Sequence, residues 1–172
     1  TRYPLVTGVQ TCALPILCFS SSCAMLLEAL RPGSLQGPNG DDAYLGRVLR
    51  YGDTTDATAQ IKALASFGVT ATLTKAADWK TIEAQIDRGI PVPIGILHKG
   101  LVSAPTGGGH WICAIGYDAD AIIVHDTFGE LDLLNGGYVN NWGARLRYSR
   151  QNLARRWMVE GPGSGWAIIA QP

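Results

Sequence analysis

The chain has 172 residues, of which 47% are hydrophobic and only 16% charged, against a usual charged share of about a quarter. Its 14 basic and 14 acidic side chains cancel, so no basic surface is expected and nucleic acid is not a predicted partner. No apolar run approaches the roughly 20 residues that a membrane-spanning helix needs, so no transmembrane segment is predicted.

Residues 1–16 (TRYPLVTGVQTCALPI) look like a sequencing artefact. Val6–Ile16 is the translation of a common sequencing-library adapter, and Thr1-Arg2 fits the upstream arm of the same adapter. We therefore expect a non-native segment at 1–16 and a single domain at 17–172, which is long enough for a sizeable core. On this interpretation Cys12 is not a native residue and the native N-terminus is missing, so the localisation stays open.

Three other cysteines, Cys18, Cys23 and Cys113, are too few for a disulfide framework. No CxxC motif or His/Cys cluster has the spacing of a zinc site. No metal or other cofactor is therefore predicted.

The segment Leu17–Leu30 (LCFSSSCAMLLEAL) is predicted to form a helix that is buried on most sides. Cys18 lies just before the expected start of this helix, where free N–H groups and the helix dipole favour a thiolate. Cys23 falls within the first turns, among core residues. A cysteine in front of a buried helix is by itself more often a small core residue than a nucleophile.

The next part of the chain alternates between predicted helices and strands. Apolar spacing and turn residues predict helices from Gly40 to Gly52, from Asp53 to Gly68 and from Asp78 to Gly89, and strands at Val69–Thr74 and Pro91–Leu97. The prolines of Pro91–Leu97 favour an edge strand. A Gly/Pro/Ser-rich loop follows over His98–Gly109.

The stretch Gly107–Gly129 (GGGHWICAIGYDADAIIVHDTFG) predicts a β-hairpin of two largely buried strands around a polar turn. His110 opens the first strand and Asp126 closes the second, so the hairpin brings both residues to the same end of the sheet. A carboxylate beside an imidazole fixes the tautomer and stabilises the imidazolium, as in a catalytic triad. The alternative interpretation is a histidine at a strand end with no catalytic role.

After Asp126 the sequence predicts an irregular Gly/Asn-rich region at Gly129–Gly143, a short helix at Ser149–Arg155, and strands at Trp157–Glu160 and Trp166–Ala170. A helical half that precedes an antiparallel β half predicts an α+β domain.

Two motifs resemble a known family. HWICAIGY, followed by an apolar strand and DTFG, resembles the histidine hairpin of papain-like cysteine peptidases. CFSSSCAM resembles more closely the nucleophile helix of cysteine peptidase family 39, the bacteriocin-leader peptidases, and its phage and bacterial relatives. In those proteins the catalytic cysteine stands seven residues before a helix methionine, as Cys18 stands before Met25.

The resemblance extends in element order from Cys18 to Ala170 and implies a papain-like fold, with the nucleophile helix packed on an antiparallel sheet. It implies Cys18 as nucleophile, His110 as base and Asp126 as the residue that orients the base. The family also has an oxyanion-hole glutamine upstream of the cysteine, a position that falls within 1–16. It has glycine after the nucleophile, where this chain has Phe19.

Other residues of catalytic type have weaker arguments. Cys23 is the rival nucleophile, although burial would raise its pKa, and Cys113 is expected in the core. His125 should face away from Asp126, and His98 is a loop residue without an evident partner. Two further segments are read as structural: Asn140–Gly143 as a loop, and the basic C-terminal region as a solvated face (Arg145, Arg147, Arg150, Arg155 and Arg156).

The predicted function is that of a cysteine peptidase that hydrolyses a peptide bond through a thioester acyl-enzyme. The alternatives are a phage or bacterial peptidoglycan hydrolase with the same triad, and an inactive peptide-binding module of the same fold. The predicted partner is a peptide or a peptidoglycan peptide, and the chain is predicted to be a monomer.

Overall fold

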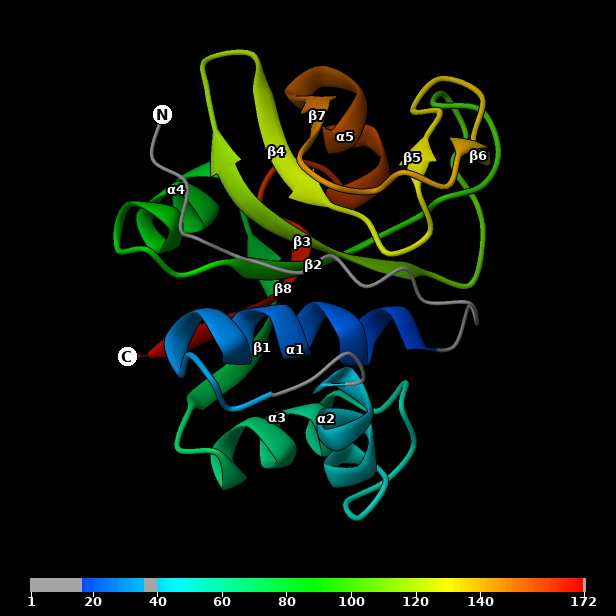
Figure 1. The fold of residues 1–172 in the computed structure, drawn as a ribbon. Helices are drawn as coiled ribbons and strands as arrows, with labels where there is room; N and C mark the ends of the chain where they lie inside the picture. Colours follow the sequence, from blue (N-terminus) through cyan, green and yellow to red (C-terminus); the bar gives the residue numbers. More distant parts are fainter. Residues whose placement is uncertain (1–16, 36–39, 172) are drawn as a thin grey trace.

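Helix α1 (Cys18–Leu30) runs through the middle of the molecule, between two further helices and a β-sheet (Figure 1). The computed structural model describes residues 17–35 and 40–171. The other elements follow in chain order: α2 (Gly40–Val48), α3 (Ala57–Ser66), β1 (Thr70–Ala77), α4 (Trp79–Asp87), β2 (Val92–Ile96), β3 (His110–Tyr117), β4 (Ala121–His125), β5 (Glu130–Leu131), β6 (Tyr138–Asn140), β7 (Leu146–Ser149), α5 (Arg150–Trp157) and β8 (Gly165–Gln171).

The main sheet has six strands in the order β1-β8-β2-β3-β4-β7, and every neighbouring pair is antiparallel. Strands β5 and β6 form a separate two-stranded sheet. Helices and an antiparallel sheet together make the α+β architecture that the sequence predicted.

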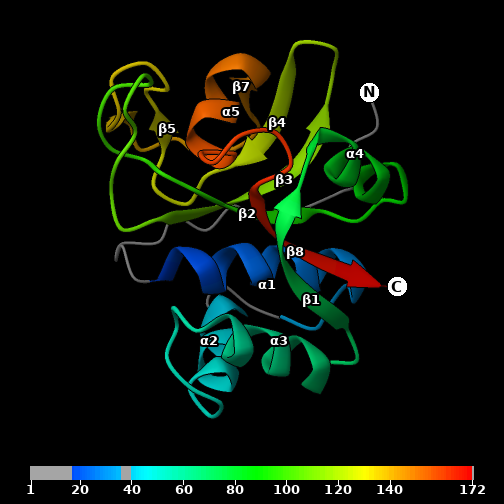
Figure 2. The same cartoon turned by 180° about the vertical axis from the view of Figure 1, so that it is seen from behind.

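The two faces of the sheet are covered by different helices. Along β3, Ile112 and Ala114 point into a core that includes residues of α4 and α5, whereas Cys113 and Ile115 pack against Met25 of α1. Viewed from behind, α2 and α3 lie on the far side of α1 from the sheet (Figure 2). Helix α1 is therefore buried from two sides, as its apolar composition indicated.

Polar residues cap three of the helices. Asp56 accepts a hydrogen bond from the N–H of Thr58 at the start of α3, Asp78 and Thr81 form a capping box on α4, and Ser149 caps α5. Helix α1 differs, because its N-cap residue is Leu17 and an apolar side chain cannot accept a hydrogen bond.

Two strand predictions are wrong. Strand β2 is internal, between β8 and β3, although Pro91–Leu97 was expected at an edge. Its ladder with β8 consists of Ile94 and Gly95, so Pro93 lies outside that ladder and its lack of an N–H does not interrupt it. Trp157–Glu160 is not a strand, because α5 continues to Trp157 and buries its helical face.

The region after Asp126 is more ordered than the sequence indicated. The short strands β5 and β6 lie within Gly129–Gly143, and β7 extends the main sheet beside β4. The prediction for 1–16 lies outside the described residues. In the described part of the chain, no helix has the length and apolar character required to span a bilayer.

Candidate active site

Cys18 is the first residue of α1, and its side chain is almost buried, with 6% exposure. The backbone N–H groups of a first helical turn have no partner within the helix, so they favour negative charge at this position. The backbone N–H of Trp111, on β3, donates a hydrogen bond to the Cys18 sulfur at 3.4 Å. The sulfur therefore lies where the start of α1 meets the start of β3.

His110 and Asp126 lie together at one end of the β3–β4 hairpin. His110 Nε2 donates to Asp126 Oδ1 at 2.7 Å, and both side chains have 0% exposure. The other ring nitrogen, Nδ1, has no hydrogen-bond partner of standard geometry among the described residues. The hairpin that the sequence predicted thus brings the two residues into contact.

Three further groups hold Asp126 in position. Oδ1 also accepts from the N–H of Phe128 at 3.0 Å, and Oδ2 accepts from the Tyr148 hydroxyl at 3.2 Å. The N–H of Asp126 donates to the carbonyl of Gly143 at 2.8 Å. A Cβ at Gly143 would overlap the carbonyl oxygen of Asp126, so only glycine allows this approach.

The surroundings of His110 favour its protonated form. Burial alone lowers the pKa of His110, but the hydrogen bond to Asp126, the charge of Asp126 and the proximity of the Cys18 thiol raise it to about 9. Phe128 stacks on the imidazole, with ring centroids 4.4 Å apart and an interplanar angle of 20°. The imidazole next to Cys18 is therefore protonated at neutral pH.

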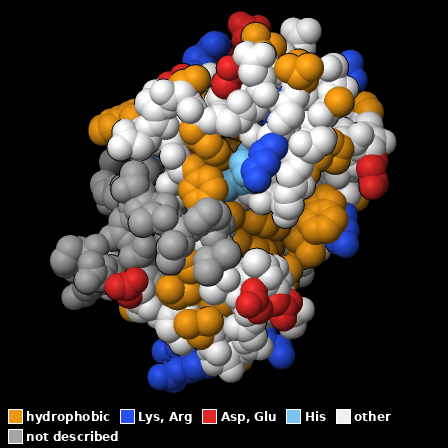
Figure 3. Space-filling model, turned by 90° about the vertical axis from the view of Figure 1, so that its right-hand side faces the viewer, with side chains coloured by type: hydrophobic (Ala, Val, Ile, Leu, Met, Phe, Trp, Pro, Cys, Tyr) orange, Lys and Arg blue, Asp and Glu red, His pale blue; other side chains and the backbone are white. Residues whose placement is uncertain are grey.

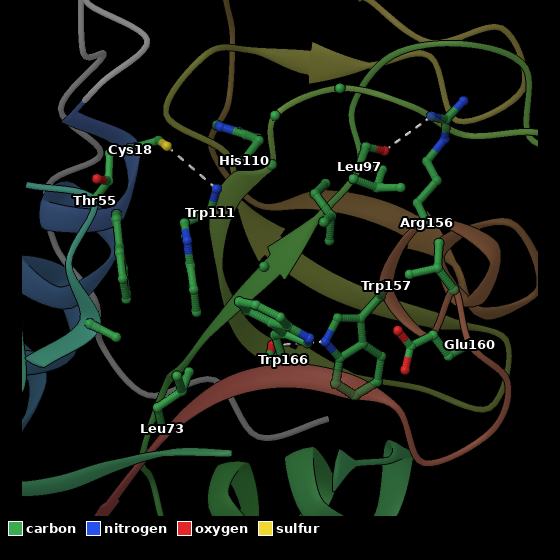
Figure 4. Close-up of a pocket in the computed structure, with 18 residues that line it drawn as sticks. Cys18, Thr55, Leu73, Leu97, His110, Trp111, Arg156, Trp157, Glu160 and Trp166 are labelled. Carbon is green, nitrogen blue, oxygen red and sulfur yellow. Dashed lines mark hydrogen bonds between the residues drawn. The ribbon is translucent and has the colours of Figure 1, made fainter. Parts of the chain in front are cut away.

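A groove of about 680 Å³ leads away from Cys18 and His110. Figure 3 shows this hollow, with hydrophobic side chains along it and histidine atoms in one wall. Its lining includes three tryptophans and the glycine loop Gly107–Gly109, and it reaches Glu160 at the other end (Figure 4). The lining of the groove is mainly apolar, so it can bury apolar parts of a ligand.

A family model described as the Peptidase C39-like family matches residues 9–157. The chain belongs to the Peptidase C39-like family. It is therefore a cysteine peptidase, and the resemblance noted in the sequence is confirmed.

Three solved structures share the fold of this C39-like peptidase. A C39-like peptidase from Bacillus anthracis is 13% identical with a TM-score of 0.65, and the match covers 98% of this chain and 95% of that one. A double glycine motif protease from an AMS/PCAT transporter, in complex with a leader peptide, is 15% identical with a TM-score of 0.59 (96% and 91% covered). The peptidase domain of Streptococcus ComA is 16% identical with a TM-score of 0.56 (99% of both chains covered). No curated protein sequence matches the chain significantly.

The structure separates the rival candidates from the site of this C39-like peptidase. Cys23 and Cys113 are fully buried, and burial raises the pKa of both thiols. His125 is directed elsewhere, because its Nδ1 accepts a hydrogen bond from the N–H of Arg145 at 3.1 Å. The described residues include no group of three or more His, Cys, Asp or Glu side chains that could hold a metal ion.

Sequence reasoning missed several residues around His110. His98, which was given no partner, lies 5.4 Å from His110 between ring centroids, and burial together with the charges of His110 and Lys99 lowers the pKa of His98 to about 4. The signal in the sequence was that His98 directly follows one predicted strand and His110 opens the next, because antiparallel pairing of the two strands, Ile96 with His110, brings these ends together. The contact of Tyr148 with Asp126 could not be predicted in this way, since β7 was not among the predicted strands.

The arginine-rich C-terminal region is not simply a solvated face. Arg156 has 0% exposure. Its guanidinium donates hydrogen bonds at 2.8–3.2 Å to four backbone carbonyls, those of Leu97, Lys99, Gly100 and Leu133. Arg147, by contrast, is more than half exposed and pairs with Asp118. Arg156 thus fixes the loop after β2, one wall of the groove.

Proposed function

We propose that this C39-like peptidase hydrolyses a peptide bond with Cys18 as nucleophile, His110 as general acid and base, and Asp126 as the residue that orients His110. The observation that carries the proposal is the fully buried 2.7 Å contact between His110 and Asp126, beside a cysteine at a helix start. The family and the shared fold support the peptidase chemistry but leave the residue roles and the substrate to experiment.

The proposed reaction has two steps. The Cys18 thiolate attacks the carbonyl carbon of the scissile bond and a C–S bond forms. The C–N bond breaks as protonated His110 gives a proton from Nδ1 to the leaving nitrogen, which produces a thioester and a free amine. Neutral His110 then takes a proton from water, and the water oxygen attacks the thioester. The C–S bond breaks, a carboxylic acid leaves, and the thiolate and imidazolium are restored.

The groove supports an extended peptide as substrate. It passes Cys18 and His110 and is lined mainly by apolar side chains and by the glycine loop Gly107–Gly109, in which a Cβ at Gly108 or Gly109 would meet no other atom within 4 Å. A fold neighbour, the double glycine motif protease, has a leader peptide in its structure. We infer a polypeptide substrate for this chain on the same basis.

Acylation by a p-nitrophenyl ester of a short blocked peptide tests the residue roles, because a burst is detectable even when turnover is slow. We expect a burst of p-nitrophenol near one equivalent and an acyl group on the tryptic peptide that contains Cys18. Cys18→Ala should abolish both, whereas the matched change Cys113→Ala should retain them. A Cys12→Ala background removes the cysteine that lies outside the described residues.

A burst that persists in Cys18→Ala, or an acyl group on Cys23, would contradict the assignment. The peptidase step itself is measured by release of a fluorescent amine from a library of peptide amides. Release should require Cys18, His110 and Asp126 together.

A further inference from the structure

The residues that follow Cys18 and His110 in the chain are both aromatic, and these two neighbours are stacked on each other. Phe19 follows Cys18 on α1, and Trp111 follows His110 on β3. Their ring centroids are 3.8 Å apart, and the ring planes differ by only 3°. The stack therefore joins the helix that positions the thiol to the strand that positions the imidazole.

The first turn of α1 needs such a contact. Its N-cap residue, Leu17, offers no side-chain acceptor, and the first turn has no acidic residue. A helix start without a cap leaves its N–H groups unsatisfied and frays easily. The contacts that hold the turn against the described residues include the hydrogen bond from Gln60 Nε2 to Ser20 Oγ at 2.8 Å and the stack of Phe19.

Trp111 provides a firm surface for the stack. Its backbone pairs with Gly95 of β2, and a Cβ at Gly95 would be 3.3 Å from two atoms of the indole ring, so the indole lies directly against that strand. In Figure 4 the indole is seen edge-on below the side chains of Cys18 and His110. The backbone N–H of Trp111 also donates to the Cys18 sulfur. A shift of Phe19 along the indole would thus move the sulfur relative to both the N–H donor and the imidazole.

We propose that Phe19 and Trp111 are positioning residues: their stack sets the separation and orientation of the Cys18 thiolate and the His110 imidazolium. This inference rests on the proposed function of Cys18 and His110. It also explains how the chain accommodates Phe19 at a position where the relatives that its motif resembles have glycine. The large side chain is 3% exposed and forms part of the contact between α1 and β3.

Phe19→Leu tests the inference, because leucine retains most of the buried apolar volume but cannot stack. The measurement is a ratio of two rates of iodoacetamide alkylation of Cys18, the rate at about pH 6 divided by the rate at strongly alkaline pH. The lower pH is well below the ordinary thiol pKa of about 8.5. We expect Phe19→Leu and Trp111→Ala to lower the rate at about pH 6 by roughly ten- to a hundredfold, as a misplacement of about 1 Å does. The alkaline rate should change little, since ionisation there no longer depends on His110.

Two further variants separate positioning from stability. Trp111→Phe keeps a ring and the backbone N–H, so it should retain most of the reactivity at about pH 6. Leu26→Ala removes buried volume from the same helix and the same core cluster, so it should lower the melting temperature but leave the pH profile unchanged.

An unchanged pH profile in Phe19→Leu, with the wild-type chain reactive at about pH 6, would overturn the positioning role and leave the proposed function intact. The inference also fails if Leu26→Ala alters the profile as much as Phe19→Leu does. A wild-type Cys18 that is unreactive at about pH 6 would overturn both this inference and the proposed function.

Discussion

The substitution Asp126→Asn keeps the shape of the side chain but removes its charge from the 2.7 Å contact with His110. In the wild-type chain the pKa of His110 is raised from 6.5 to about 9, although burial alone would lower it. At roughly 1.4 kcal/mol per pH unit this difference corresponds to about 3 kcal/mol in favour of the imidazolium. Without the charge of Asp126 we expect the pKa of His110 to fall by about 2 pH units or more, since burial then opposes only the contribution of Cys18.

The same change alters the pH dependence of stability. A folded-state pKa above the unfolded value stabilises the fold fully below about pH 6.5, and this stabilisation is lost as the pH rises through about 9. The free energy of unfolding of the wild-type chain should therefore contain a contribution that declines across this window. Asp126→Asn should lack the decline, as measured by urea unfolding at a series of pH values.

NMR titration of the imidazole C–H signals measures the pKa directly. Single variants of His98 and His125 assign the other two histidines. Asp120→Asn makes the same chemical change at an exposed turn and should leave the His110 titration where it is. If His110 in Asp126→Asn still titrates near pH 9, the reasoning about its charge partners is wrong.

Three more substitutions test the groups around the site. Gly143→Ala should cost about 2 kcal/mol or more in unfolding free energy and reduce the burst, because its methyl group overlaps the carbonyl of Asp126; an unchanged melting temperature and burst would refute this. Tyr148→Phe should cost about 1–3 kcal/mol in urea unfolding, since it leaves the buried N–H of Leu131 unpaired and removes the donor to Asp126, and a neutral result would contradict it. Arg156→Met should destabilise by about 3 kcal/mol in thermal unfolding, because four carbonyls lose their donor, and a variant as stable as the wild type would count against that role.

Local pattern was sufficient for the central features. The spacing of His110 and Asp126 around a polar turn defined a hairpin, and the buried helix that follows Leu17 was evident from its run of apolar residues. These features depend on periodicity and turn residues within a short window, which sequence alone carries. Their mutual contact could be predicted because both ends of a hairpin return to the same edge of a sheet.

The groups that surround the site depend on contacts distant in sequence. Gly143 was read as part of a loop, yet its backbone lies against that of Asp126, and no local pattern indicates this approach. Tyr148 lies on β7, a strand of only four residues in which Leu146 and Tyr148 alternate with Arg147 and Ser149, and the sequence analysis had read the arginines here as a solvated face. Trp157 was assigned to a strand together with the apolar residues that follow it. In the structure Leu153, Arg156 and Trp157 are the buried residues of α5, and their spacing of three and four residues is that of one helix face.

The partition of iodoacetamide among the cysteines at mildly acidic pH tests the central claim most directly. Quantitative mass spectrometry of tryptic peptides gives a separate rate for each thiol of the folded chain. We predict that Cys18 is alkylated well ahead of Cys23 and Cys113, and that His110→Ala removes this advantage because the imidazolium no longer stabilises the thiolate. Faster alkylation of Cys23, or an advantage of Cys18 that survives in His110→Ala, would contradict the account.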